Sequence, residues 1–136
     1  MSWAIEIEPG LWQGDCPQTP ADTARFQTVV TVSDDAQPPA PRPYRWVDKG
    51  IPDVDPGPNA VWIADLAATM RYAPEPVLVH CKMGLSRSSL AMVVVLIDRH
   101  GWSIEEAVAA LRAKHPRANL HPAYLDRVRE WLALAR

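Results

Sequence analysis

Residues 77–101, VLVHCKMGLSRSSLAMVVVLIDRHG, combine a short apolar segment, a loop and a helical pattern. The run VLV at 77–79 predicts a short buried strand. After the loop, apolar residues recur at helical spacing, and Gly101 is placed to end the helix that they predict. The core-facing residues of this helix are Leu90, Val93, Val94 and Ile97. A strand that leads through a loop into a helix is typical of α/β domains with parallel sheets.

The sequence before residue 77 predicts further strands. Residues 5–13 alternate between apolar and polar and break at Pro9-Gly10, which indicates two short strands around a turn. Residues 28–32, TVVTV, are β-branched throughout and predict a central buried strand. Residues 44–47 predict one more strand, whereas the proline-rich segments 38–43 and 50–58 predict loops.

Three further helices are predicted by apolar residues at helical spacing. The first begins near Asn59, the second follows a capping box of Ser103 and Glu106, and the third opens at Pro122. Their predicted core faces are, in that order, Trp62, Ile63, Leu66 and Met70; Ile104, Val108 and Leu111; and Leu125, Val128 and Leu132. We therefore expect one compact α/β domain over residues 1–136, with a central, mainly parallel sheet of about four to five strands flanked by helices.

Composition narrows the class of protein. The chain has 136 residues, of which 48% are hydrophobic and 22% are charged, as in a soluble globular domain. The 16 acidic and 14 basic residues give a net charge of -2, so we expect no nucleic-acid partner. Two cysteines are too few for a secreted disulfide framework. The N-terminal residues do not form a signal peptide, and the apolar run 90–97 is too short to cross a bilayer, so we expect a cytoplasmic protein without stable membrane anchoring.

The loop 80–89, HCKMGLSRSS, lies where α/β sheets bind ligands, beyond the carboxyl end of a strand. Such a loop directs backbone N–H groups toward one point beside the positive end of the helix dipole, which attracts an anion of phosphate size. Gly84 supplies the backbone freedom that a tight loop needs, and Arg87 can grip two phosphate oxygens at once. The predicted phosphate-binding residues are Lys82, Met83, Gly84, Leu85, Ser86 and Arg87.

Cys81 stands at the start of this loop, below the predicted phosphate. A cysteine at a helix N-terminus beside basic side chains ionises readily, which predicts that Cys81 is a thiolate at neutral pH. A thiolate in this position can attack phosphorus and form a covalent intermediate that water later hydrolyses. We expect Ser88 to turn its hydroxyl toward the sulfur and to stabilise it as a leaving group.

The loop resembles the signature of the cysteine-based protein tyrosine phosphatase superfamily, His-Cys-x-x-Gly-x-x-Arg-Ser/Thr. Its Ser-Arg-Ser form is most similar to the dual-specificity branch. Residues 7–14, IEPGLWQG, resemble the opening segment of dual-specificity domains, and residues 51–55, IPDVD, resemble their general-acid loop. The likeness extends over nearly the whole chain, and outside the signature it is much less specific.

The resemblance assigns further roles. A proton donor must assist the leaving oxygen, and the family pattern Ile-Pro-x-x-Asp implies Asp55, with Asp53 as the rival. His80 is implied to orient the loop and tune the thiolate rather than to react. Many relatives brace the loop with an asparagine turn before the last helix, a part that Asn119 or His121 would take here.

Several alternatives share these residues. A lipid, inositol or sugar phosphatase would use the same chemistry, and Lys82 begins the loop as in some lipid phosphatases. A catalytically idle phosphate-binding module and a persulfide sulfurtransferase are less consistent with the combination of Cys81, Arg87 and a candidate acid. Cys16 is expected to be inert, with a resolving disulfide to Cys81 as the alternative.

The expected substrate is a phosphorylated protein or a small phosphomonoester. We expect phosphotyrosine, together with phosphoserine and phosphothreonine, because a short chain offers little to wall off a deep pocket. No cofactor is expected, and the cysteines and histidines lack the spacing of a metal site. The sequence leaves the oligomeric state open.

Overall fold

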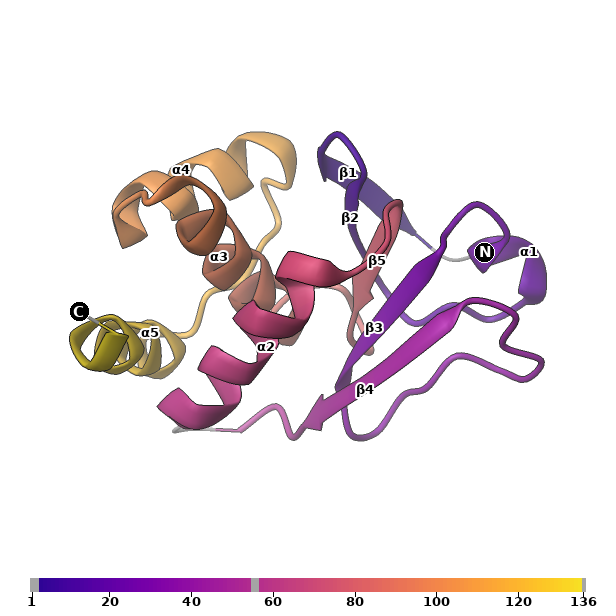
Figure 1. Cartoon of the computed structure of the whole chain (residues 1–136), viewed down its shortest axis with the longest axis horizontal. Coiled ribbons are helices and arrows are strands. Elements are labelled where there is room, and N and C mark those ends of the chain that lie inside the picture. Colours follow the sequence, from indigo (N-terminus) through magenta and orange to yellow (C-terminus); the bar gives the residue numbers. More distant parts are fainter. Residues whose placement is uncertain (1–2, 55–56, 136) are drawn as a thin grey trace.

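Five strands form one sheet, in the order β1-β2-β5-β3-β4 (Figure 1). The structure is a computed structural model that describes residues 3–54 and 57–135. Strands β2, β5, β3 and β4 pair in parallel, and β1 pairs with β2 in antiparallel orientation. The strands are β1 (Ala4–Glu8), β2 (Leu11–Gly14), β3 (Thr28–Ser33), β4 (Arg45–Ile51) and β5 (Val77–His80). The predicted α/β class with a mainly parallel sheet is confirmed.

The four long helices lie on one side of the sheet, and a short helix lies on the other side (Figure 1). The long helices are α2 (Ala60–Tyr72), α3 (Arg87–His100), α4 (Ile104–Lys114) and α5 (Pro122–Ala135). The short helix, α1 (Pro20–Thr23), was not predicted. Its single turn is too short to show an apolar periodicity, and it is specified instead by its capping box and its proline in the first turn.

Helix α3 is the centre of the hydrophobic core. Each of its residues from Arg87 to Ile97 is buried. A helix that is apolar on all sides needs partners on all sides, and α3 packs against β5, α2, α4 and α5. It ends at Gly101, which takes the left-handed conformation with φ of 68°. This packing fixes the N-terminus of α3 at the carboxyl end of β5.

Two sequence-based expectations about these elements were wrong in detail. Strand β4 continues to Ile51, into the segment predicted to be a loop, because it pairs with β3 as far as Ser33. The buried face of α5 consists of Tyr124, Val128 and Trp131, while Leu125 and Leu132 are only partly buried. The two aromatic side chains have the same helical spacing as the leucines, and tertiary packing selects them.

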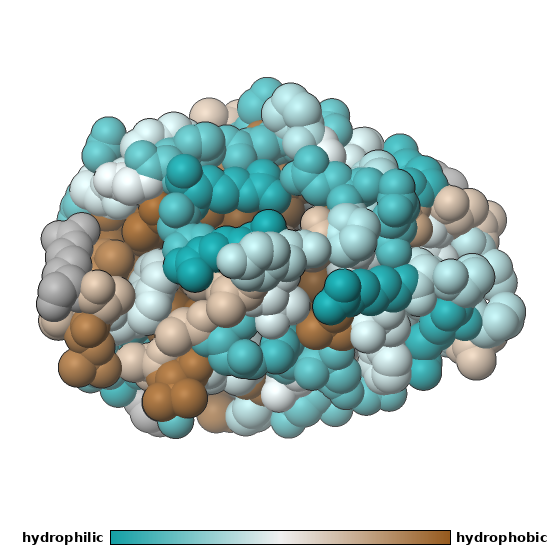
Figure 2. Space-filling model, viewed as in Figure 1, coloured by the Kyte–Doolittle hydropathy of each residue, from teal (hydrophilic) through white to brown (hydrophobic). Residues whose placement is uncertain are grey.

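The molecular surface is mostly hydrophilic in the view of Figure 2. The most hydrophobic residues there gather at the end of the molecule that holds the start of α2 and the end of α5. Val61 and Leu134 are each 77% exposed in this region. Within the described ranges, every helix is too short or too polar to span a lipid bilayer.

Candidate active site

The predicted phosphate loop lies between the last residue of β5, His80, and the first residue of α3, Arg87. Cys81 is almost fully buried at its start, with 2% of its surface exposed. The Gly84 amide donates a hydrogen bond to Cys81 Sγ at 3.2 Å, and Ser88 Oγ lies 3.3 Å from the same sulfur. The loop therefore curls around the thiol, and the first turn of α3 brings Ser88 to it.

Four carbonyl groups of this loop are held by hydrogen bonds from the surrounding protein. The Cys81 and Lys82 oxygens accept from the His80 ring at 3.1 Å and the Cys16 amide at 3.3 Å. The Gly84 oxygen accepts from His115 Nε2 at 2.9 Å. The Leu85 oxygen accepts from the Asn119 amide at 2.8 Å and from Ser89 Oγ at 2.6 Å.

These carbonyl bonds determine where the loop's amides point. In a planar trans peptide, the C=O of one residue and the N–H of the next point in opposite directions. Since the carbonyls turn toward the surrounding protein, the N–H groups of residues 82, 83, 85 and 86 turn toward the inside of the loop. The Gly84 amide donates to the sulfur. Together, these inward-pointing amides form a nest of hydrogen-bond donors around one point above Cys81.

His80 belongs to a buried hydrogen-bonded chain beneath the loop. Thr31 Oγ1 accepts from Trp46 Nε1 at 2.8 Å and lies 2.7 Å from His80 Nε2. Because the Cys81 carbonyl can only accept, His80 carries its proton on Nδ1, and Nε2 accepts from the Thr31 hydroxyl. Burial lowers the pKa of His80 to about 4. The ring is therefore neutral at physiological pH and orients the Cys81 peptide.

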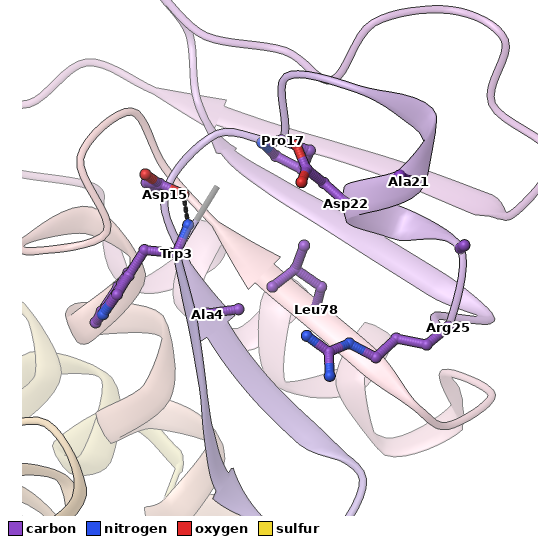
Figure 3. A pocket seen from close by; sticks show the side chains of 9 residues that line it. Trp3, Ala4, Asp15, Pro17, Ala21, Asp22, Arg25 and Leu78 are labelled. Atoms are coloured by element: carbon purple, nitrogen blue, oxygen red, sulfur yellow. Dashed lines mark hydrogen bonds between the residues drawn. The ribbon is translucent and has the colours of Figure 1, made fainter. Parts of the chain in front are cut away.

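Gly84 allows the loop to approach the N-terminal segment closely. Its φ is 69°, and an added Cβ would lie 2.5 Å from Trp3 Cζ3 and 2.8 Å from the Asp15 amide nitrogen. Asp15 Oδ1 in turn accepts from the Trp3 amide at 2.6 Å (Figure 3). These contacts support the loop from behind, and a larger residue at position 84 would push it forward.

A cavity of about 350 Å³ lies on the sheet face opposite to the long helices (Figure 3). The Arg25 guanidinium points into it, beside Leu78 of β5, while the Trp3 indole points away. Arg25 stacks on the Trp12 ring at 4.2 Å from the ring centroid. Cys81, Arg87 and the rest of the phosphate loop lie outside the lining of this cavity.

Arg87 is 4% exposed and is held at one end of its guanidinium group. Nη1 donates to the Ile51 carbonyl at 3.0 Å and forms ion pairs with Asp35 at 2.9 Å and Asp34 at 3.4 Å. Hydrogen bonding to Arg87 lowers the pKa of Asp35. Arg87 Nε is buried and has no hydrogen-bond partner among the described residues. A buried unpaired guanidinium nitrogen is costly, and an anion in the loop would satisfy it.

Asp53 is the described carboxylate that reaches the phosphate loop from the predicted acid loop. Ser86 Oγ donates to its two oxygens at 2.8 and 2.9 Å, and the Tyr124 hydroxyl donates to Oδ1 at 2.5 Å. Burial, together with Asp53, raises the pKa of Tyr124 well above its usual range. The ring of Tyr124 also packs against Gly57, where an added Cβ would lie 2.7 Å from it. Tyr124 therefore ties the acid loop to α5.

The other predicted site residues differ in their exposure and in their partners. Asp55 lies outside the described residues. Lys82 and Met83 are exposed at the rim, with Met83 65% exposed. His121 Nδ1 accepts from the Ala123 amide at the start of α5 and does not brace the loop through this bond. Asn119 braces the loop instead, because its backbone amide donates to the Leu85 carbonyl.

The family was identified by comparison with known proteins. The family model described as "Dual specificity phosphatase, catalytic domain" matches residues 63–133, slightly more than half of the chain. The chain belongs to the dual specificity phosphatase family. The matched region contains the whole phosphate loop and helices α3 and α4.

Two curated proteins illustrate the relationship. Human phosphatidylglycerophosphatase and protein-tyrosine phosphatase 1 is 35% identical over 82 residues, which cover 60% of this chain and 39% of that protein. Dual specificity protein phosphatase 1B of Arabidopsis thaliana is 24% identical over 133 residues, or 93% of this chain and 80% of that protein. The chain thus aligns with less than half of the length of the first relative.

Solved structures share the fold of this dual specificity phosphatase domain. Human DUSP28 superposes with a TM-score of 0.83 at 21% identity, covering 98% of this chain and 95% of that one. PTPMT1 in complex with PI(5)P has a TM-score of 0.80 at 19% identity, covering 98% and 99%. At these low sequence identities, the structural similarity shows only that the fold is shared.

Sequence reasoning missed several residues of the site, among them Gln13 and His115. The Gln13 amide of β2 donates to Ser88 and Ser89, and His115, just after α4, donates to the Gly84 carbonyl. Both side chains are buried polar groups. Gln13 carried one signal, because strand alternation places this polar residue on the same face as the apolar Leu11. Nothing in the sequence around His115 distinguishes it from a surface residue after a helix.

The described residues hold no group of three or more histidine, cysteine, aspartate or glutamate side chains arranged to bind a metal ion. The reactive groups that meet at the site are the Cys81 thiol, the Arg87 guanidinium, the loop amides and the neighbouring carboxylates.

Proposed function

We propose that this chain hydrolyses phosphomonoesters through a cysteinyl-phosphate intermediate on Cys81. The observation that carries the proposal is the ring of inward amides around the sulfur, bordered by the unpaired Nε of Arg87. A phosphoryl group in this ring would accept hydrogen bonds from the amides of residues 82, 83, 85 and 86. Such preorganised donors stabilise the charge that develops on the phosphoryl oxygens in the transition state.

In the first step, the Cys81 thiolate attacks phosphorus from below the ring. An S–P bond forms, and the bond from phosphorus to the ester oxygen breaks on the opposite side. Arg87 holds two phosphoryl oxygens, using the edge of its guanidinium that includes Nε, while Nη1 stays on the Ile51 carbonyl. The in-line geometry follows from the position of Cys81 at the base of the loop.

The departing oxygen needs a proton, which the acid loop supplies. Sequence matching favours Asp55, which lies outside the described residues. Asp53 lies at the rim, where its oxygens accept hydrogen bonds from Ser86 of the phosphate loop and from Tyr124, an arrangement that suits an ionised carboxylate better than a proton donor. We therefore propose Asp55 as the proton donor and keep Asp53 as the rival that mutation must test.

In the second step, water attacks the phosphorus of the intermediate. The acid-loop carboxylate accepts a proton from the water, an O–P bond forms, and the S–P bond breaks. The sulfur leaves with the bonding pair as a thiolate, stabilised by the Gly84 amide and the Ser88 hydroxyl. Inorganic phosphate then dissociates and the site is restored.

The charges around the rim favour substrates with one phosphate. Asp34 and Asp35 are about half exposed beside Arg87, and Asp53 lies at the end of the loop. A second phosphate close to the first would meet these carboxylates, which repel it. We therefore propose phosphotyrosine in proteins as substrate, and phosphoserine and phosphothreonine as well, because a short chain offers little to wall off a deep pocket and the rim residues Lys82 and Met83 are exposed.

A lipid substrate is the second candidate, because relatives are named for it. The human relative carries the name phosphatidylglycerophosphatase, and the PTPMT1 structure holds PI(5)P. A phosphatidylglycerophosphate headgroup has a single terminal phosphomonoester, so the carboxylates at the rim oppose it less than they oppose a headgroup with several phosphomonoesters. Comparing hydrolysis of phosphopeptides with hydrolysis of vesicles that carry either class of headgroup would separate the protein substrate from the lipid substrate.

We further propose that the chain acts as one catalytic domain in the cytoplasm, as its composition predicts. A phosphorylated protein or a small phosphomonoester is then its partner, and no cofactor takes part.

Hydrolysis of an aryl phosphate by the wild-type chain and by Cys81→Ser tests the proposal. We expect turnover by the wild type and none by the variant, which should still bind vanadate because the amides and Arg87 remain. A wild type that binds vanadate without turnover would instead be an idle phosphate-binding module. Turnover of thiosulfate without turnover of the aryl phosphate would indicate sulfur transfer.

A further inference from the structure

Gln13 occupies an unusual position for a glutamine. It lies in β2, opposite Val79 of β5, and is fully buried. Its Nε2 lies 2.9 Å from Ser88 Oγ, 2.9 Å from Ser89 Oγ and 3.3 Å from the Gly84 carbonyl oxygen. The amide therefore connects an interior strand with the first turn of α3, immediately beside Cys81.

The hydrogens in this cluster can be assigned by counting donors and acceptors. The Gln13 amide has two N–H hydrogens, and the two serine oxygens are its nearest acceptors. Ser89 donates its own hydroxyl hydrogen to the Leu85 carbonyl at 2.6 Å. Ser88 accepts from Gln13, so when Cys81 is a thiolate the single Ser88 hydrogen is free to donate to the sulfur, which lies 3.3 Å from Ser88 Oγ.

Gln13 is poorly explained as a stabilising residue. Its Oε1 is buried and finds no hydrogen-bond partner in the described part of the chain. A buried acceptor without a partner lowers stability, and an aliphatic side chain of similar size would avoid that cost. The neighbouring strand positions Leu11 and Val79 are apolar and fully buried. The benefit of a glutamine here lies in its two donors.

We propose that Gln13 is a positioning residue that directs the Ser88 hydroxyl toward the Cys81 sulfur. The inference rests on the proposed phosphatase function. Its effect falls on the second step, in which water forms the new O–P bond and the sulfur leaves with the S–P bonding pair. The acid-loop carboxylate takes the proton from the water. Without the bond from Gln13, the Ser88 hydroxyl can rotate away, and the departing thiolate loses a donor.

The test compares Gln13→Leu with wild type in burst-phase and steady-state hydrolysis of an aryl phosphate with a good leaving group. We expect hydrolysis of the cysteinyl-phosphate to slow about tenfold, the order expected for one lost hydrogen bond. Formation of the intermediate should change little, so phosphate should accumulate on Cys81. The unfolding midpoint should stay unchanged or rise, because the unpaired Oε1 is gone.

A double-mutant cycle separates positioning from a general structural effect. In the Ser88→Ala background, Gln13→Leu should cause no further slowing, because the group that it positions is absent. Equal slowing in both backgrounds, or wild-type kinetics in Gln13→Leu, would overturn the inference.

Two further variants make the test robust. Gln13→Met keeps an unbranched side chain, so it serves if the leucine variant folds poorly. Gln27→Leu is the matched control: it makes the same substitution at an exposed glutamine just before β3, at the end of the sheet away from the loop, and should leave both steps unchanged. If the wild type itself forms no phosphate adduct on Cys81, the proposed function fails rather than the role of Gln13.

Discussion

The floor and the rim of the phosphate loop are built differently. The floor is buried and is joined by hydrogen bonds to the rest of the fold. It comprises Gln13, Thr31, His80, Ser88 and His115. The rim carries exposed charges, among them Asp34, Asp35 and Lys82, together with the acid loop. In the proposed mechanism, the floor supports Cys81 and Arg87, which act on phosphorus, whereas the rim meets the molecule that carries the phosphate.

This difference indicates where substitutions should act. A buried polar network is worth most when every member is satisfied, so loss of a floor residue should affect the chemical steps or the stability of the fold. Exposed charges interact weakly through water, so loss of a rim residue should shift the preference among substrates. The following predictions test that division.

The largest effect among them is expected for Arg87→Lys. An ammonium group cannot copy the bidentate grip on two phosphoryl oxygens, so kcat/KM for an aryl phosphate should fall roughly 10³-fold. Arg25→Lys is the matched control, because Arg25 stacks on Trp12 away from the loop. Similar rates for Arg87→Lys and the control would contradict the proposed grip of Arg87 on the phosphoryl group.

The acid loop joins the two regions, and Asp55→Asn should show this. We expect about a 10²-fold loss for substrates with poor leaving groups and little loss for good ones, because only the former need the proton. Asp53→Asn is the comparison variant, and its asparagine keeps an oxygen for Ser86 and Tyr124. A leaving-group dependence in Asp53→Asn alone would move the assignment to Asp53.

Titration of His80, a floor residue, should make the stability of the folded protein depend on pH. Its folded pKa, about 4, lies below the value of 6.5 for an exposed histidine. Between these values the unfolded chain binds the proton and the folded chain does not, so stability falls as pH drops from 6.5 to 4. The loss should approach about 3 kcal/mol.

Chemical denaturation at several pH values measures this effect. His80→Asn removes the titrating ring and should abolish that part of the slope. Thr31→Val weakens the same network, leaves a buried histidine, and should keep the slope. A wild-type slope in His80→Asn would show that another group is responsible.

The smallest effect is expected at the rim, for Asp34→Asn combined with Asp35→Asn. The preference for a monophosphate over a substrate with a second nearby phosphate should weaken by about two- to fivefold, the size of an interaction between exposed charges. Glu105→Gln, at an exposed carboxylate in the first turn of α4, should leave the ratio unchanged. An unchanged ratio in the double variant would show that the rim does not select by charge.

The sequence predicted the local parts of this molecule well. The strand, loop and helix around Cys81 are contiguous, so their apolar periodicity and glycine placement were sufficient to locate the phosphate loop. The same holds for the Ser103 cap of α4 and for Gly101 at the end of α3. Here the interactions that define the structure lie within a few residues of one another.

The parts that could not be predicted depend on contacts between distant residues. Gln13 is 75 positions from Ser88, and only the pairing of β2 with β5 brings them together. The buried face of α5 was misjudged because Tyr124 and Leu125 fit the helical pattern equally well. Tyr124 is buried because Asp53 and Gly57 come to it from the acid loop.

The central claim is that phosphate passes through a covalent bond to Cys81. Wild-type protein is mixed with an aryl phosphate, quenched in acid within one turnover, and its peptides are mapped by mass spectrometry. The account predicts phosphate on the peptide that contains Cys81, and a loss of turnover in Cys81→Ser of at least about 10⁴-fold. Turnover without phosphate on that peptide, or a serine variant that works at the wild-type rate, would contradict it.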